Sequence, residues 1–123
     1  MSEIEELQAE LVDKWDELHK KSMVSLLIML ALFESPMWSK ELEEWLKNVA
    51  GWELNERSLH RTLKRMAALG LISFTEVDAP KTGASRKVFE LSDLGVSFLE
   101  LTKNSSLNYL HNHIFLDKLK AIS

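Results

Sequence analysis

The sequence predicts a protein that is mainly α-helical with a small β-hairpin. Three observations indicate this class. Apolar residues recur every three or four positions along most of the chain, two short alternating stretches flank a turn at residues 78–85, and there are only four Gly and two Pro. With 123 residues the chain fits a single domain that is large enough to bury a core.

Two helices are expected before residue 35. From Glu3 to Lys21, apolar positions at a spacing of three or four alternate with charged residues, which is typical of an amphipathic helix. Residues Ser22 to Glu34 are more apolar and predict a buried helix that ends at Ser35-Pro36, because the residue before a proline disfavours helical conformation. The apolar stripe of the first helix is narrow, so we expect it to pack on another chain or on the last helix.

Two further helices follow. The first is expected from Ser39, as its N-cap, to near Gly51, and its predicted core side is Leu42, Trp45, Leu46 and Val49. The second begins after Asn55, a favoured N-cap, and ends near Gly70, where a left-handed residue commonly terminates a helix. Its predicted buried residues are Leu59, Leu63, Met66 and Leu69.

The opposite face of the helix after Asn55 is basic. Arg57, His60, Arg61 and Lys64 recur at helical spacing on the side away from the leucines. Residues 57–87 hold seven basic and two acidic side chains, although the net charge of the chain is −4. A basic surface on an acidic protein indicates a polyanionic partner, while an ordinary solvated helix face is the alternative that charge alone leaves open.

A hairpin and a final helix complete the chain. Residues 71–77 and 86–92 alternate as two strands, with Lys81, Arg86 and Lys87 at the tip and on the return strand. Ser92 is expected to cap a helix that carries Leu94, Phe98 and Leu101 on one face. Residues 102–108 are poor in helix formers, so this helix should end or bend there before an apolar stripe resumes.

The order helix, helix, basic helix, hairpin, helix is that of a winged helix-turn-helix. In this fold the third core helix enters the major groove of DNA and the hairpin, or wing, contacts the backbone or the minor groove. We therefore expect a winged helix-turn-helix with extra N- and C-terminal dimerisation helices. Its predicted parts are a dimer arm at residues 1–21, a DNA-binding domain at 22–92 and a dimerisation helix at 93–123.

Three blocks of the sequence resemble the PadR-like transcriptional regulators: LLIMLALFESPMWSKELEEWL, LNERSLHRTLKRMAALGLIS and SRKVFELSDLGVSFL. The resemblance covers Ser22 to Leu99. It implies a homodimeric regulator, most often a repressor, that binds double-stranded DNA and is joined through its terminal helices. Within the family, the long N-terminal helix and the short C-terminal part resemble a clock-associated cyanobacterial member.

The resemblance also implies which residues contact DNA. The family's Ser-Leu-Tyr element corresponds to residues 58–60, with His60 in place of the tyrosine, and its basic pairs correspond to residues 64–65 and 86–87. The expected DNA contacts are Arg57, Ser58, His60, Arg61, Lys64, Arg65, Lys81, Arg86 and Lys87. Two features differ from the family. Its HGYEL stretch is MWSKEL here, and the aromatic residue that some relatives use for flat ligands has no Trp counterpart in the final helix.

Apolar residues that remain at both ends of the chain are expected to form the dimer interface. They are Leu7, Leu11, Trp15, Leu18, Leu107, Leu110 and Ile114. Trp15 has charged neighbours and should anchor that interface, whereas Trp38, Trp45 and Trp52 are expected in the core. A ligand pocket among these tryptophans at the dimer interface is the alternative, with an unidentified small-molecule effector.

Several classes of function are not expected. The chain has no cysteine, which excludes disulfides, thiolate metal sites and a cysteine nucleophile. His111 and His113 stand two residues apart and would point to different faces of a helix, so no metal site is expected. No phosphate-binding glycine loop, Ser-His-Asp order or pair of catalytic carboxylates is evident, so we expect neither an enzyme nor a cofactor.

Two remaining signals concern location and function. The apolar run Met23 to Phe33 is shorter than the roughly 20 residues that cross a membrane, and the acidic N-terminus is unlike a signal peptide, so a cytoplasmic protein is expected. A sequence-specific transcriptional regulator is the predicted function. The alternatives are a winged-helix adaptor that binds a protein instead of DNA, or a ligand sensor at the dimer interface.

Overall fold

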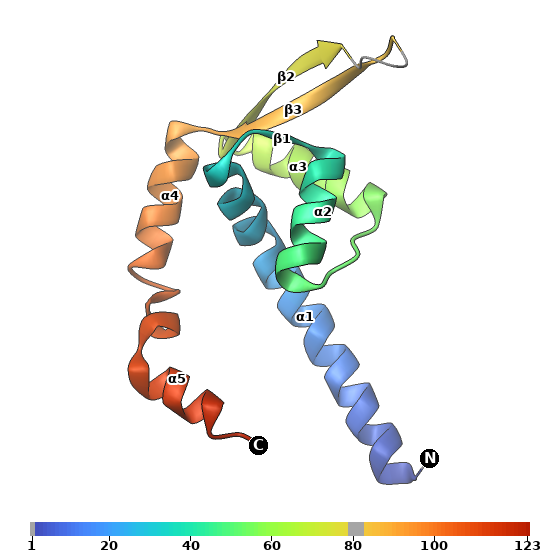
Figure 1. Ribbon diagram of the computed structural model, residues 1–123, viewed down its shortest axis with the longest axis vertical. Helices are drawn as coiled ribbons and strands as arrows, with labels where there is room; N and C mark the ends of the chain where they lie inside the picture. The colour runs from blue at the N-terminus through green and yellow to red at the C-terminus, as the bar shows by residue number, and fades with distance from the viewer. Residues whose placement is uncertain (1, 79–82) are drawn as a thin grey trace.

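The computed structural model describes residues 2–78 and 83–123 (Figure 1). The elements are α1 (Glu3–Glu34), β1 (Met37–Trp38), α2 (Ser39–Ala50), α3 (Glu56–Ala68), β2 (Ile72–Asp78), β3 (Ser85–Leu91), α4 (Asp93–Lys103), the 3-10 helix η1 (Asn108–His111) and α5 (His113–Lys120). The prediction of a mainly helical chain with one hairpin is confirmed.

Helix α1 is a single helix of 32 residues, so the prediction of two separate helices meeting at residue 21 is wrong. Neither glycine nor proline stands near that position, and the backbone continues while the composition changes from charged to apolar. The buried residues of α1 all lie in its C-terminal part, from Leu26 onward. In Figure 1 the N-terminal half extends away from the body of the domain as an arm. The predicted end of the helix before Ser35-Pro36 is confirmed.

The core lies where the C-terminal half of α1 meets α2, α3 and the sheet. Its largest fully buried side chains are Ile28, Met29, Leu42, Leu46, Leu59 and Leu63. Val49 and Leu69 were predicted in the core, but they are 57% and 63% exposed. Val49 lies in the last turn of α2 and Leu69 caps the end of α3. The helical periodicity therefore extends past the point where neighbouring elements still cover the apolar face.

The sheet has three antiparallel strands in the order β1-β3-β2. Strands β2 and β3 form the predicted hairpin, in a register that runs from Ile72 opposite Leu91 to Asp78 opposite Ser85. Strand β1 adds to the other edge of β3, and its Trp38 stands opposite Val88. The connection between α1 and α2 is thereby attached to the middle of β3.

The helix ends are fixed largely as predicted. The Asn55 side chain accepts hydrogen bonds from the amides of Arg57 and Ser58 at 2.8 and 3.3 Å, which confirms this N-cap. Gly51 and Gly70 have positive φ angles of 73° and 80°. Ser39, in contrast, is the first residue of α2 and not its N-cap. The N-cap is the preceding residue, Trp38, whose amide donates to the Glu41 carboxylate at 3.1 Å.

The C-terminal segment forms a second arm. The Ser92 hydroxyl oxygen accepts from the Gly95 amide at 3.0 Å, as expected of an N-cap, and α4 then ends at Lys103 within the predicted break. The chain continues through η1 into α5. In Figure 1 the arm made by α4 and α5 diverges from the N-terminal half of α1, with the sheet at the end where the two arms converge.

Candidate nucleic-acid interface

Helix α3 turns its basic side chains to solvent because its leucines are held in the core. Leu59 and Leu63 are each 1% exposed, and Met66 is 3% exposed. The predicted DNA-contacting residues of this helix are all exposed: Arg57, Ser58, His60, Arg61, Lys64 and Arg65. We call Arg57, His60, Arg61 and Lys64 the basic ridge of α3.

The arginines and the lysine of the ridge have no acidic partner in the part of the chain that the structure describes. Among residues 2–78 and 83–123, no ion pair joins Arg57, Arg61 or Lys64 to an acidic side chain. His60 is one turn from Glu56, and its Nε2 lies 3.7 Å from the Glu56 carboxylate. The arginines and the lysine are therefore available to an external anion.

The wing presents its two described basic residues differently. Arg86 is half-buried, with its guanidinium carbon 4.2 Å from the centroid of the Trp38 ring. The Arg86 Nε atom is buried and finds no hydrogen-bond acceptor in the described part of the chain. Lys87 is exposed, and its ammonium lies 4.5 Å from the centre of the Phe74 ring. The predicted contact Lys81 lies outside the described residues.

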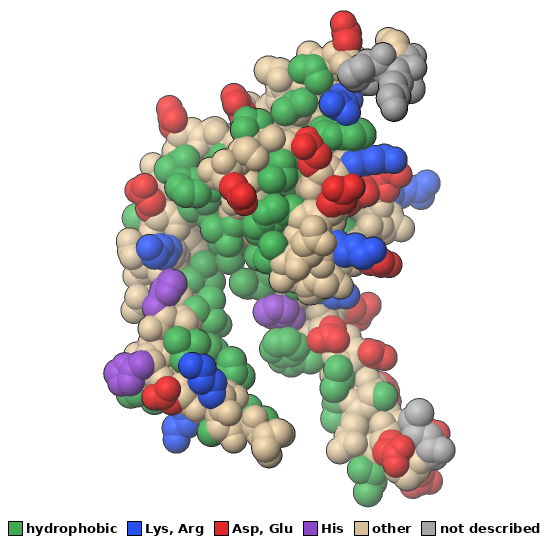
Figure 2. Space-filling model, viewed as in Figure 1, with side chains coloured by type: hydrophobic (Ala, Val, Ile, Leu, Met, Phe, Trp, Pro, Cys, Tyr) green, Lys and Arg blue, Asp and Glu red, His purple; other side chains and the backbone are tan. Residues whose placement is uncertain are grey.

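Apolar side chains gather on the two arms. Leu7, Leu11, Trp15 and Leu18 on α1 are 55%, 56%, 62% and 69% exposed, and Ile114 on α5 is 58% exposed. In Figure 2 hydrophobic side chains line the facing sides of both arms, where the space between them is open. Two predicted interface residues are less available, since Leu110 is half-buried and Leu107 packs against the core of its own chain.

The tryptophans occupy three kinds of environment. Trp52 is buried, and Trp45 packs on the core while its indole N–H donates to the Glu34 carboxylate at 3.2 Å. Trp38 is half-buried beneath Arg86. Trp15 is largely exposed and stacks on His19, with ring centroids 4.8 Å apart.

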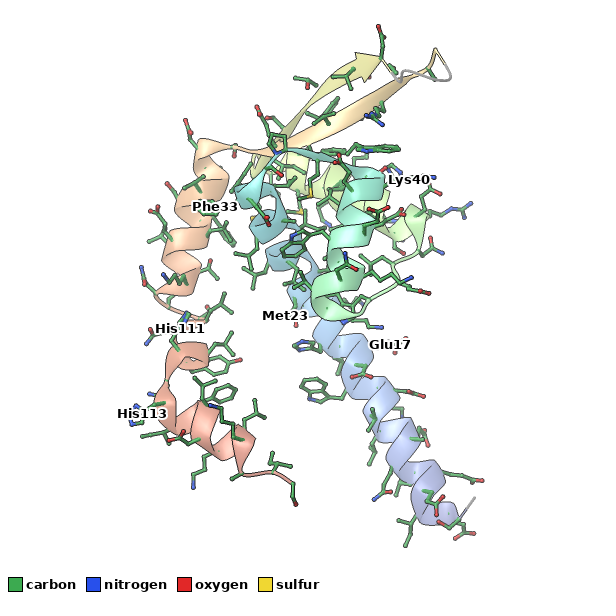
Figure 3. The ribbon with its side chains drawn as sticks, viewed as in Figure 1. Glu17, Met23, Phe33, Lys40, His111 and His113 are labelled. Atoms are coloured by element: carbon green, nitrogen blue, oxygen red, sulfur yellow. The ribbon has the colours of Figure 1, made fainter. Side chains whose placement is uncertain are left out.

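The two C-terminal histidines lie on separate elements. His111 ends η1 and His113 begins α5, and Figure 3 shows both on the C-terminal arm. Within the ranges that the structure describes, no cluster of three or more His, Asp or Glu side chains could hold a metal ion. The same residues include no helix that is long and apolar enough to cross a membrane.

Sequence reasoning missed a second group of cations beside α3. Lys20 and Lys21 of α1 line a cleft that also contains Arg61 and Arg65. In the sequence the lysines stand at an expected helix boundary, far from the basic residues of α3. Their spacing along the chain gave no sign that the two helices meet there.

The helices α2 and α3, the hairpin that follows them and the exposed basic ridge define a winged-helix domain. The model of the PadR-like family of transcriptional regulators matches residues 27–101. The chain belongs to this family.

Solved structures agree with this assignment. A PadR-like transcription factor from Bacteroides fragilis is 30% identical with a TM-score of 0.67, and the match covers 82% of this chain and 98% of that one. A PadR family regulator from Eggerthella lenta is 17% identical with a TM-score of 0.69, and the match covers 95% and 98%. PadR of Bacillus subtilis, in complex with operator DNA, is 20% identical with a TM-score of 0.58, over 63% and 45%. No curated protein sequence matches. These three structures give no support to the narrower resemblance to a clock-associated protein.

Proposed function

We propose that this protein is a homodimeric repressor that places α3 in the major groove of a specific operator and the wing on the DNA backbone. The observation that carries the proposal is the exposed basic ridge opposite the buried leucines of α3. Its Arg57, Arg61 and Lys64 form no ion pair among residues 2–78 and 83–123. A B-DNA major groove admits one α-helix, and Arg and Lys side chains reach both base edges and phosphates from it. The structure of the Bacillus subtilis relative, solved in complex with operator DNA, supports operator DNA as the partner.

Position on α3 assigns different roles to its side chains. Arg61 and Lys64 lie near the middle of α3 and are proposed to contact base edges or the nearest phosphates. Arg57, Ser58 and His60 lie nearer the N-terminus of the helix, which is the end that usually reaches the bases. Arg65 stands on the flank of the helix and is assigned to a phosphate.

The wing is proposed to bind the DNA backbone through exposed cations. Lys87 fits this role best because it is exposed, and Lys81 remains a predicted contact. Arg86 is also retained as a proposed contact, but its stacking on Trp38 leaves only part of the side chain for a phosphate.

Dimerisation is proposed through the two arms. Their exposed leucines, together with Trp15, would leave a large apolar surface in water in an isolated chain, and a second copy would cover it. A two-fold axis would then place two α3 helices in successive major grooves, about 34–36 Å apart. The proposal places the protein in the cytoplasm and gives it no catalytic reaction and no cofactor.

Selection of bound duplexes from a random pool tests the proposal, since it reveals the operator and its symmetry together. With the selected duplex, wild-type protein should bind in a gel-shift titration, and Arg61→Ala/Lys64→Ala should not. The control Lys118→Ala/Lys120→Ala removes the same charge from α5 and should bind as wild type does. Sedimentation should show that all three proteins have the same oligomeric state.

Salt dependence separates this function from that of a protein-binding adaptor. Each phosphate contact releases counterions, so the affinity of the regulator for DNA should fall steeply between about 50 and 200 mM salt. Unchanged DNA binding by Arg61→Ala/Lys64→Ala would contradict the proposal that the basic ridge contacts DNA.

A further inference from the structure

A cleft between α1 and α3 collects positive charge from both helices. Its volume is about 280 Å³, and four of its lining residues are cationic: Lys20, Lys21, Arg61 and Arg65. None of the lining residues in the described part of the chain is acidic. Lys20 and Lys21 are exposed, as are both arginines, so an incoming group can reach all four.

These four cations have no partner of opposite charge in the described part of the chain. The ion pairs formed within residues 2–78 and 83–123 involve Lys14, Lys47 and His60, and none involves a cation of the cleft. Four like charges around one small space repel each other and disfavour the compact state. An anion bound between them would relieve this repulsion.

The remaining lining of the cleft favours a compact anion. Val24 packs on the core and Leu59 is 1% exposed, so one side of the cleft is apolar and keeps water from that side of a bound group. Thr62 already donates its hydroxyl hydrogen to the Ser58 carbonyl at 3.0 Å. Ser58 also lines the cleft and adds a neutral hydroxyl group near the cations.

A phosphate group fits this lining better than a carboxylate does. A carboxylate brings one negative charge, whereas a phosphate monoester brings about −1.5 to −2 and three acceptor oxygens. Arginine binds phosphate through two parallel hydrogen bonds, and lysine adds a compact charge. Four cations from two helices match the larger charge.

We propose that the α1–α3 cleft is a phosphate-binding site, in which Lys20 and Lys21 act together with Arg61 and Arg65. The phosphate belongs either to the DNA strand that flanks the groove entered by α3 or to a free phosphate compound. A free compound would compete with DNA, because Arg61 and Arg65 serve both. Binding of a DNA phosphate in the cleft rests on the proposed function, whereas binding of a free phosphate compound does not.

The variant Lys20→Gln/Lys21→Gln tests the site while keeping good helix formers and most of the side-chain length. Its control, Lys118→Gln/Lys120→Gln, removes the same charge from α5. Circular dichroism and thermal unfolding of the full chain should show that both variants remain folded.

The first measurement uses inorganic pyrophosphate and no DNA. In calorimetric titrations at low salt, wild type and the α5 control should bind pyrophosphate saturably, and Lys20→Gln/Lys21→Gln should bind it at least tenfold more weakly. This result identifies a site for free phosphate compounds. It does not depend on whether the protein binds DNA.

The second measurement uses the selected duplex at a series of potassium chloride concentrations. If the cleft takes a backbone phosphate, Lys20→Gln/Lys21→Gln should lower the slope of log affinity against log salt by about one unit for each phosphate that the variant no longer binds. Its preference for the selected sequence over a scrambled one should remain.

A weaker interaction in either measurement supports the site and identifies the source of the phosphate. Wild-type behaviour of Lys20→Gln/Lys21→Gln in both measurements overturns it. If wild-type protein binds no duplex, the proposed function fails. The pyrophosphate titration alone then tests the phosphate site, and absence of pyrophosphate binding by wild-type protein overturns it.

Discussion

The guanidinium carbon of Arg86 lies 4.2 Å from the centroid of the Trp38 ring. Arg86 is on β3, and Trp38 belongs to β1 and caps the start of α2. The pair therefore joins the wing to the first helix of the helix-turn-helix, beside the two-residue pairing of β1 with β3. A cation above a tryptophan ring contributes roughly 0.5–2 kcal/mol, depending on how far it is removed from water.

The first prediction concerns this stacking. Trp38→Ala and Arg86→Ala should each destabilise the fold, and the double variant should lose less than the sum of the two, by about 0.5–2 kcal/mol. Urea unfolding of the four proteins in the cycle measures this coupling. Additive losses would mean that the ring and the guanidinium are close without stabilising each other.

The Ser92 hydroxyl group joins the turn after α3 to the first turn of α4. Its oxygen lies 2.6 and 2.8 Å from the carbonyl oxygens of Gly70 and Leu71, which share its single hydrogen, and it accepts from the Gly95 amide. Ser92→Ala should therefore lower the free energy of unfolding by about 1–2 kcal/mol. Ser97→Ala, on an exposed position of α4, is the control and should change stability little. Equal effects of the two variants in urea unfolding would contradict the role given to Ser92.

Gly95 is required by close packing and not by its backbone angles. A Cβ atom at this position would overlap the Leu71 carbonyl oxygen and crowd the Leu91 side chain. Gly95→Ala should therefore cost about 1–3 kcal/mol, although alanine is the better helix former by roughly 1 kcal/mol. Thermal unfolding of wild type, Gly95→Ala and the control Ser97→Ala measures this loss of stability. A Gly95→Ala protein as stable as wild type would show that α4 shifts freely away from Leu71.

The arm of α1 should control assembly. Leu11→Glu places a charge in the exposed apolar stripe and should convert the proposed dimer to monomers at micromolar concentration, because a buried unpaired charge opposes association. Ala9→Glu adds the same charge on the opposite side of the helix and should leave the dimer intact. Sedimentation velocity of both variants makes the comparison. Dimers that survive Leu11→Glu would place the interface elsewhere.

The helix that carries the basic ridge was predictable because its signals are local. Asn55, the leucine spacing and Gly70 all lie within or beside α3, and each acts through its own turn of the backbone. The exposed ridge followed from the same periodicity. Family resemblance then added the wing residues, which charge alone did not distinguish from ordinary surface cations.

What could not be predicted depends on residues distant in the sequence. Strand β1 has two residues, too few to show alternation, and it exists because β3 pairs with it. The expected helix boundary at residue 21 is a change from charged to apolar residues within one helix. The composition changes because the C-terminal part of α1 is buried and the N-terminal part is exposed, while the helical backbone is continuous. Lys20 and Lys21 meet α3 only after folding, and the contact between Arg86 and Trp38 depends on β1.

The continuity of α1 has a mechanical consequence. At 1.5 Å per residue its 32 residues form a rod roughly 48 Å long, with one end fixed in the core and the other outside it. No glycine or proline interrupts the rod to absorb bending. In the proposed dimer two such rods would cross. Because each rod is stiff, a small change in their crossing angle would displace the distant ends and alter the distance between the two α3 helices.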